Sequence, residues 1–395
     1  MAKRRRSMKI NSGMLEGGPH PTIFADAPSI RRPAGLVDPG MGRIGSRLVL
    51  LLALVAAAAA CSSRSAAPAG ERQPQPQAGA DVPAGRTPTG ERVRVELAGE
   101  RIARLAPAAA AGAEAEAWLW PAIVDSHVHL TYWPVADRVA ASGIAAGVDL
   151  AAPAVRDAPP LHVLSSGPML TRPGGYPLAS WGSDGYGLGC GDAACVTAAI
   201  ERLASQGARV IKLALDDDGL DPSLLPAAVA AAHGKRLKVA VHALSARSAR
   251  LAADAGADLL AHTPIELLPP DTAAAWRGRA VISTLAAFGG GEAAVANLRA
   301  LRAAGTTILY GTDLGNLRDA GPSAAELELL RAAGLDDAAI TDAMTTAPAR
   351  YWALPFGAVA PGAEASLLVL DRDPRTDARV LLAPREVWLR GRRMR

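Results

Sequence analysis

The stretch AIVDSHVHL, residues 122–130, places two histidines one residue apart at the end of an apolar run. In a β-strand, residues i and i+2 point to the same face, so His127 and His129 are predicted to lie side by side. Two imidazoles that share one face at a strand end form a pincer suited to a metal ion. Such a pair alone is weak support for a metal site.

Short apolar runs that alternate with Ala/Leu-rich helical stretches decide the expected fold. Strands separated by helices at this spacing indicate βα units and a parallel sheet. Eight such units suggest a closed (β/α)8 barrel, a TIM-like α/β fold. The eight runs are 122–130, 146–150, 161–164, 210–215, 238–244, 257–262, 280–285 and 307–313.

The two ends of the folded part have a different pattern. RVRVELAGERIARLAP, residues 92–107, alternates charged and apolar residues around Gly99 and predicts a β-hairpin. Residues 356–395 again indicate short strands with turns. We therefore expect 92–121 and 356–395 to pair as a small satellite sheet beside a barrel formed by residues 122–355.

The N-terminal region is typical of a targeting sequence. Residues 41–60 hold a short basic segment, an apolar run and small residues, the layout of a secretory signal peptide. With Cys61 at the boundary, this region resembles a bacterial lipoprotein signal and predicts an exported protein, lipid-anchored to the cell envelope. A plain signal peptide and a soluble periplasmic protein are the alternative. Residues 1–40 are interpreted as an upstream extension, and the Ser-, Pro- and Gln-rich residues 61–91 predict a flexible linker.

The net charge of +4 comes from the N-terminal region. Residues 1–60 carry nine Lys/Arg against three Asp/Glu, whereas the remaining residues carry 33 against 35. A folded part of balanced charge offers no basic face for nucleic acid. The expected partners are a small-molecule substrate and, through a lipid at Cys61, the membrane; a homo-oligomer stays open.

The other two cysteines, Cys190 and Cys195, lie in the segment GCGDAACV. In an exported protein this spacing favours a small-loop disulfide, with free thiols as the main alternative and metal binding as a weak third one.

Polar residues interrupt the predicted barrel strands at or near their C-terminal ends. A parallel strand buried on both faces should be apolar nearly throughout, and barrel enzymes place their active sites at these ends. Four histidines and a carboxylate at such ends suit zinc or a similar divalent ion. The interrupting residues are His127, His129, Lys212, His242, His262 and Asp313.

Lys212, in RVIKLAL, is one of five lysines in a chain with 37 arginines. Because arginine is the usual cation of this chain, a lysine here indicates that the position requires an amine and not only a positive charge. A cation beside a divalent metal would be repelled, and carboxylation of the amine to a carbamate would remove that conflict. The alternative is a lysine that reaches the rim or pairs with Asp216.

Several segments in this order resemble the amidohydrolase superfamily, in particular its imidazolonepropionase-like and prolidase-like branch. The resemblance covers roughly residue 92 to the C-terminus and implies a distorted (β/α)8 barrel beside a β-sandwich built from both chain ends. The segments are VDSHVHL, VIKL, VHAL, LLAHTP, YGTDLGN and TTAPARYWALPFGAVAPGAEASLLVLDRDP.

The resemblance also implies roles for the polar strand-end residues. His127, His129 and Asp313 would hold one ion, and His242 and His262 a second, with carboxylated Lys212 between them. One or two Zn2+ per chain is the expected cofactor. Asp313 would act as the general base that takes a proton from the attacking water and passes it to the leaving nitrogen.

The connection after the third run, residues 165–195, is too long for routine barrel wiring and predicts a lid or substrate loop. Relatives often carry a GGHG segment here, whereas this chain has GGYP. The candidate substrate contacts, in this loop and just after the histidine pair, are Tyr132, Trp133, Arg172, Tyr176, Trp181 and Tyr186.

Three other polar residues are interpreted as structural. His162 opens the third run on the side away from the chemistry, and His233 fits a helix C-terminus. Asp125 is expected to orient its neighbours or to cap the strand end.

The leading hypothesis is an exported, metal-dependent amidohydrolase that cleaves a C–N amide bond of a dipeptide, an N-acyl amino acid or a cyclic amide. A lactonase or phosphoesterase that uses the same site is the enzymatic alternative. A non-catalytic lipoprotein that binds metal or ligand is the alternative from another class.

Overall fold

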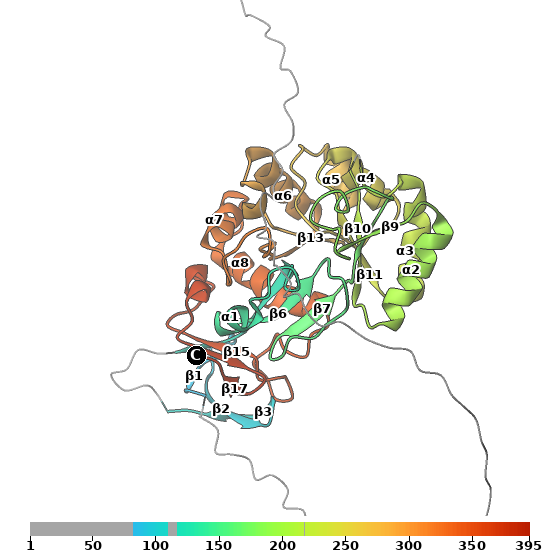
Figure 1. Ribbon diagram of the computed structural model, residues 1–395. Helices are drawn as coiled ribbons and strands as arrows, with labels where there is room; N and C mark the ends of the chain where they lie inside the picture. Colours follow the sequence, from blue (N-terminus) through green and yellow to red (C-terminus); the bar gives the residue numbers. More distant parts are fainter. Residues whose placement is uncertain (1–81, 110–116, 217) are drawn as a thin grey trace, which may run out of the picture. The chain divides into compact units, whose positions relative to one another are not determined.

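The computed structural model describes residues 82–109, 117–216 and 218–395, which form a mixed α/β fold with curled sheets (Figure 1). The predicted upstream extension, signal peptide and anchor residue Cys61 lie outside the described residues. None of the helices in the described ranges combines the length and the apolar character that crossing a bilayer requires.

Two sheets of parallel strands form the central region. One has the order β5-β6-β7 and the other β14-β13-β12-β11-β10-β8-β9. Each of the eight runs expected from the sequence overlaps one of these strands. Strands β5, β6 and β10 are buried at every position, as expected for strands covered on both faces. The bounds are β5 (Ile123–Val128), β6 (Ile144–Asp149), β7 (His162–Ser165), β8 (Met169–Thr171), β9 (Gly187–Gly189), β10 (Val210–Ala214), β11 (Lys238–His242), β12 (Leu259–Leu260), β13 (Ala280–Ile282) and β14 (Thr307–Leu309).

Backbone hydrogen bonds tie the smaller parallel sheet to the larger one at both edges. Beyond β14, the carbonyl of Tyr310 accepts from Ser126 N of β5 at 2.9 Å. At the other edge, the carbonyl of Ser165 in β7 accepts from Arg209 N, just before β10, at 3.0 Å. Both edge strands of the smaller sheet are therefore paired rather than exposed.

Helices follow most of the parallel strands, and Figure 1 shows α2 to α8 on the outside of them. Several begin at a residue whose side chain accepts a backbone N–H of the first turn: Asp192, Ser245, Ser323 and Asp336. The bounds are α1 (Ala136–Ala141), α2 (Ala193–Ser205), α3 (Leu225–Gly234), α4 (Ala246–Asp254), α5 (Pro270–Ala275), α6 (Glu292–Ala304), α7 (Ala324–Ala332), α8 (Asp337–Met344) and α9 (Thr346–Tyr351), with the 3-10 turns η1 (Pro222–Leu224), η2 (Ala286–Phe288) and η3 (Ala378–Leu382).

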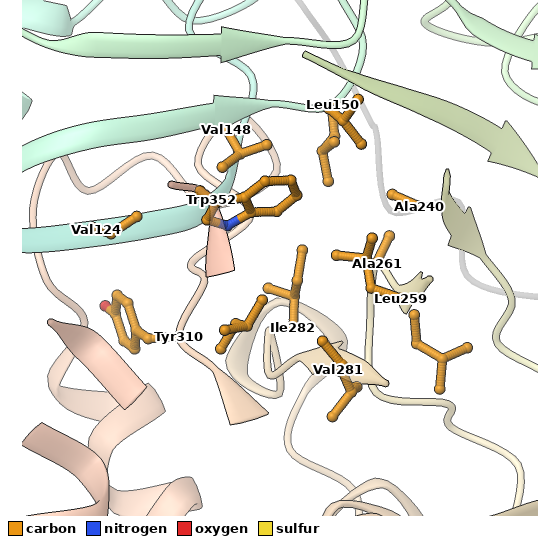
Figure 2. Close-up of a cluster of buried hydrophobic side chains, with 14 of the residues drawn as sticks. Val124, Val148, Leu150, Ala240, Leu259, Ala261, Val281, Ile282, Tyr310 and Trp352 are labelled. Carbon is orange, nitrogen blue, oxygen red and sulfur yellow. The ribbon is translucent and has the colours of Figure 1, made fainter. Parts of the chain in front are cut away.

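One apolar cluster is shared by both parallel sheets. Figure 2 shows Val124 and Val148 of the smaller sheet near Ile282 of the larger one, with Trp352 from the end of α9 among them. The indole of Trp352 also donates from Nε1 to Ser126 Oγ at 3.2 Å. Burial of this cluster therefore holds the two sheets together in addition to their backbone pairing.

Both chain ends meet in a third sheet, in the order β17-β16-β15-β4-β1-β2-β3. The expected hairpin of residues 92–107 is confirmed as β2 and β3, and antiparallel pairing of β4 with β15 joins the N-terminal to the C-terminal segment. The bounds are β1 (Gly85–Arg86), β2 (Arg92–Ala98), β3 (Arg101–Pro107), β4 (Trp118–Pro121), β15 (Leu367–Leu370), β16 (Glu386–Leu389) and β17 (Arg392–Arg393).

The linker predicted for residues 61–91 extends too far toward the C-terminus. Residues 82–91 belong to the third sheet, since β1 pairs with both β2 and β4. Val82 is 1% exposed and packs in the apolar cluster of this sheet. The polar composition of this segment suggested a tether, but burial of Val82 and the pairing of β1 with two strands order it instead.

The long connection of residues 165–195 is also more ordered than expected. It contains β8 and β9, and β8 pairs with β10, so the segment extends the larger parallel sheet. The predicted disulfide joins Cys190 to Cys195, with the Cα atoms 5.4 Å apart. It links the residue after β9 to the first turn of α2.

Candidate metal centre

The six polar strand-end residues lie together at the C-terminal end of the parallel strands. Each is at most 8% exposed, although all six side chains are ionisable: four histidines, one lysine and one aspartate. They lie in five strands or within four residues after them: β5 (His127, His129), β10 (Lys212), β11 (His242), β12 (His262) and β14 (Asp313). The sequence-predicted set is thus brought together in full.

Asp313 lies between the members of the histidine pair. Its Oδ1 is 3.1 Å from His129 Nε2 and 3.4 Å from His127 Nε2. His127, His262 and Asp313 each offer one ligand atom, and these three atoms lie within 4.8 Å of one another. The rings of His242 and His262 are neighbours, with centroids 4.9 Å apart, so His242 adjoins the same cluster.

Whether this site suits a metal ion can be judged from the histidine ring nitrogens that form no hydrogen bond within the protein. His127 Nδ1 bonds the carbonyl of Ala261 at 2.8 Å, and His262 Nδ1 bonds Thr284 Oγ1 at 3.0 Å, which leaves Nε2 of each ring for a ligand. Among the described residues, His127 Nε2, His242 Nδ1 and Asp313 Oδ1 are buried without a hydrogen-bond partner. Because unpaired buried polar atoms are costly, this arrangement fits a divalent cation.

The electrostatics of the site favour the protonation states that bind metal. Burial lowers the pKa of His127 and His262 well below the usual value and that of His242 to about 4, so all three rings are neutral at pH 7. For Asp313, burial raises the pKa, but His127, His129 and Lys212 outweigh it and hold the pKa below its usual range. Neutral imidazoles beside an ionised carboxylate are the required state.

Lys212 is 1% exposed, so it does not reach the rim. Within the described ranges it forms no ion pair with Asp216, the other partner considered from the sequence. Burial lowers the pKa of its amine to about 7, against a weaker opposing effect of Asp313. Lys212 is therefore a buried amine that faces the metal-ligand cluster without a dedicated counter-ion.

Asp125 orients the histidine pair from behind, as expected. Its Oδ1 accepts from His127 N at 3.1 Å and from Thr312 N at 3.0 Å, and its Oδ2 accepts from Thr312 Oγ1 at 2.5 Å. Burial raises its pKa to about 7. The carboxylate thus joins the end of β5 to the segment that carries Asp313.

The segment GTDLG, residues 311–315, adopts a close-packed turn against the histidine pair. Asp313 has φ +56°, in the left-handed region. At Gly315, with φ +120°, a Cβ would lie 2.8 Å from the Cβ of His129. A side chain there would push the turn away, so glycine permits Asp313 to approach both histidines.

Aromatic side chains cover the cluster on the side of the 165–195 segment. The ring of Trp181 is 5.2 Å from that of His129, and the ring of Tyr176 is 4.9 Å from that of His242. Trp181 Nε1 donates to the Tyr176 hydroxyl at 3.2 Å, and Tyr132 and Tyr186 pack on Trp181. Four of the six candidate substrate contacts therefore form one aromatic cover.

The other two candidates lie differently. Trp133 is stacked under the exposed guanidinium of Arg318, whose central carbon is 4.3 Å from the ring centroid. Arg172 is exposed at the start of the connection. Trp133 touches the metal-ligand cluster through its backbone, since Trp133 N donates to the carbonyl of His129 at 2.8 Å.

The sequence analysis missed several residues of this region. Phe288 packs on His262 with ring centroids 4.7 Å apart, and Thr284 holds His262 Nδ1. Asp149 ends β6 as a buried carboxylate whose pKa burial raises to about 6. Each follows or ends a predicted strand, but such residue types alone did not distinguish them from ordinary loop residues.

Comparison with known proteins gives structural likeness alone. No family model and no curated protein sequence matches the chain. Solved structures with a similar fold include a Xaa-Pro dipeptidase with bound methionine in the active site (TM-score 0.64, 17% identity, 76% of this chain and 94% of the other). They also include a putative prolidase from Bifidobacterium longum (0.63, 21%, 77% and 89%) and an ochratoxinase from A. niger (0.62, 19%, 78% and 93%). At these identities the likeness establishes a shared fold.

Proposed function

We propose that this protein is a metal-dependent hydrolase of the amidohydrolase superfamily that cleaves a C–N amide bond in a small molecule, such as a dipeptide, an N-acyl amino acid or a cyclic amide. The observation that carries the proposal is the buried cluster of metal-ligand atoms without hydrogen-bond partners, at the ends of parallel strands. The shared fold supports it, because similar structures include a dipeptidase and a prolidase.

The proposed architecture is a (β/α)8 barrel with a β-sandwich built from both chain ends. The backbone bonds at both edges of the β5-β6-β7 sheet are those that closure of a barrel requires. The third sheet, which contains segments from both ends, supports the second domain.

The residues present suit two divalent ions, most simply Zn2+. His127, His129 and Asp313 would hold one, His242 and His262 the other, and Lys212 would contribute to both as a carbamate. In carbamate formation, the neutral amine of Lys212 attacks CO2, an N–C bond forms and one proton leaves to solvent. Bound divalent ions supply polarisation of a carbonyl and a lowered pKa of water.

The chain's own contribution is proton transfer and exclusion of bulk water. Asp313 is ionised and buried, and its Oδ1 lies beside His127 and His129. It can therefore take the proton of the attacking water and give it to the leaving nitrogen. The aromatic cover of Tyr132, Tyr176, Trp181 and Tyr186 would line the substrate site, with Trp133 and Arg172 as outer contacts.

The proposed location is the cell envelope, with a lipid anchor at Cys61. The disulfide between Cys190 and Cys195 supports export, because such bonds persist in oxidising compartments.

Metal content tests the function. Protein from Ser62 onward, reconstituted with Zn2+ and bicarbonate, is expected to hold about two ions per chain by elemental analysis and to hydrolyse at least one member of a panel of dipeptides, N-acyl amino acids and cyclic amides. The His127→Ala/His129→Ala variant should lose metal, whereas His233→Ala, a histidine outside the site, should not. Absence of metal in the unaltered protein would overturn the proposal, and turnover of lactones or phosphoesters alone would reassign the bond cleaved.

The carbamate has its own readout. Protein equilibrated with carbon-13 bicarbonate should show a carbamate carbon resonance that is absent from Lys212→Met. One ion per chain without this resonance would support a mononuclear site with unmodified Lys212.

A further inference from the structure

Asp216 lies directly beside the metal-ligand cluster. The sequence analysis considered it only as a partner of Lys212, and the proposed mechanism does not use it. It follows β10, the strand of Lys212, and its backbone has φ +69°, in the left-handed region. Its carboxylate turns toward the end of β11, where His242 is the last strand residue. Asp216 thus lies between two of the strands that carry the proposed ligands.

The two oxygens of this carboxylate have separate tasks. Oδ1 accepts from Ser245 N at 3.1 Å and from Ser245 Oγ at 3.0 Å. Oδ2 accepts from Leu244 N at 3.0 Å and lies 3.7 Å from His242 Nε2. The peptide hydrogen bonds fix the carboxylate, and its Oδ2 is thereby held facing one nitrogen of the His242 ring.

The other nitrogen of the His242 ring is the one left for a ligand. His242 Nδ1 is buried and has no hydrogen-bond partner within the described ranges. The Tyr176 ring lies against one side of His242 with centroids 4.9 Å apart, and the edge contact with His262 restricts the ring further. His127 and His262 have the opposite arrangement, since a protein oxygen bonds their Nδ1.

We propose that Asp216 is a positioning residue, which keeps the proton of His242 on Nε2 and so directs the lone pair of Nδ1 into the metal-ligand cluster. A carboxylate behind a ligating histidine sets its tautomer and its ring orientation. The inference rests on the proposed metal site for its effect on metal binding, but the tautomer of His242 is a property of the protein alone.

The proposal accounts for the choice of carboxylate at this position. An amide in place of Asp216 has a single oxygen. When this oxygen accepts from Ser245, the NH2 group faces Leu244 N and His242 Nε2, so that donor meets donor. The Asp216→Asn variant therefore alters the contact with His242 with little change of size, and asparagine tolerates a positive φ.

Two matched variants separate this role from a purely structural one. Ser245→Ala removes a donor to Oδ1 and weakens the start of α4, but leaves Oδ2 facing His242. Asp218→Asn removes a neighbouring, exposed carboxylate. Neither variant should change His242.

The first measurement is the tautomer in metal-free protein by nitrogen-15 NMR, with the His242 signals identified by their loss in His242→Gln. The unaltered protein, Ser245→Ala and Asp218→Asn should carry the proton on Nε2, whereas Asp216→Asn should shift population to the Nδ1-protonated form. An Nδ1-protonated His242 in the unaltered protein, or no shift in Asp216→Asn, would overturn the inference whether or not the protein binds metal.

The second measurement is Zn2+ affinity of the full chain by competition with a chelator. Asp216→Asn should weaken the ion held by His242 about 10- to 100-fold, and the ion held by His127 and His129 should be unaffected. An equal loss in Ser245→Ala would show that the turn, not the carboxylate, is responsible. If the unaltered protein binds no Zn2+ but shows the expected tautomers, the proposed function fails while the role of Asp216 in orienting His242 stands.

Discussion

Histidines have opposite hydrogen-bonding arrangements at two places in this molecule. In the metal-ligand cluster, His127 Nε2 and His242 Nδ1 have no hydrogen-bond partner among the described residues. Away from the cluster, His162 Nε2 contacts Glu364 Oε2 and His233 Nε2 contacts Asp258 Oδ2, both at 2.8 Å. The difference teaches that burial and partner atoms together distinguish a ligand histidine from a structural one, because an unpaired nitrogen is costly when it is buried and is retained only where something else binds it.

The largest effect that would break this comparison is expected at Asp313. Asp313→Asn keeps the size of the side chain but removes the ionised carboxylate beside His127 and His129 and with it the base that accepts a proton. We expect hydrolysis of the substrate found in the panel to fall on the order of 1,000-fold or more, with the circular dichroism spectrum unchanged. Activity within a few-fold of the unaltered enzyme would assign the general base to another group.

The second prediction concerns Glu326, a buried carboxylate both of whose oxygens accept hydrogen bonds. It is 0% exposed and accepts from Leu285 N at 3.0 Å and Ala286 N at 2.7 Å, yet burial raises its pKa from 4.5 to about 7. Between these two pKa values the folded state holds a proton that the unfolded state releases. The contribution of Glu326 to the unfolding free energy is therefore fully present below pH 4.5 and is lost as the pH rises to 7. Relative to Glu326→Gln, the unaltered protein should lose about 3 kcal/mol of unfolding free energy over this interval.

Urea denaturation of the two proteins at several pH values between 4.5 and 7.5 checks this expectation. A difference that is flat with pH would show that Glu326 is ionised in the folded protein throughout.

The His162–Glu364 pair should affect stability and leave activity alone. Glu364 is 6% exposed; burial raises its pKa, but hydrogen bonds from His162 and Ser366 outweigh this and lower it. Its stabilising contribution is therefore present above the unfolded pKa of 4.5 and is lost as pH falls through the lower folded value. We expect Glu364→Gln to cost about 1–3 kcal/mol at pH 7 by urea denaturation, with metal content unchanged; loss of metal would place the pair in the site.

His233 should give the smallest effect. Its side chain is 45% exposed, so the contact with Asp258 is screened by solvent. His233→Ala should change the unfolding free energy by less than about 1 kcal/mol and leave metal content as it is. A larger change in a urea titration would mean that exposure is a poorer guide than the partner atoms.

Several elements could be predicted because their information is local. The eight apolar runs, the hairpin around Gly99 and the disulfide of Cys190 and Cys195 follow from spacing and composition, and the structure contains each of them. The linker boundary and the strands β8 and β9 could not be predicted in this way. Part of their pairing is with strands distant in the sequence, Arg86 with Trp118 and Leu170 with Leu213, and short segments such as Gly85–Arg86 carry no periodic pattern of their own.

The residues of the candidate site also divide into those that local sequence predicts and those that depend on distant segments. Ionisable residues at the ends of apolar runs pointed to six side chains that the structure places close together, because a parallel strand buried on both faces excludes polar residues that have no task. Phe288 and Thr284 were not identified, and Asp216 was considered only as a partner of Lys212. Each lies in a loop where polar or aromatic residues are ordinary, and each acquires its role by contact with a histidine from another strand.

The sequence by itself therefore determined the order of strands, the chain ends that pair and the residues with ligand chemistry, since these depend on periodicity and on residue type. The tertiary structure alone decided which ring nitrogen of each histidine is free, that Lys212 is sealed from solvent and that Tyr176 and Trp181 cover the cluster. These properties depend on which atoms distant segments bring within hydrogen-bond or van der Waals reach, and no local pattern of residues contains that information.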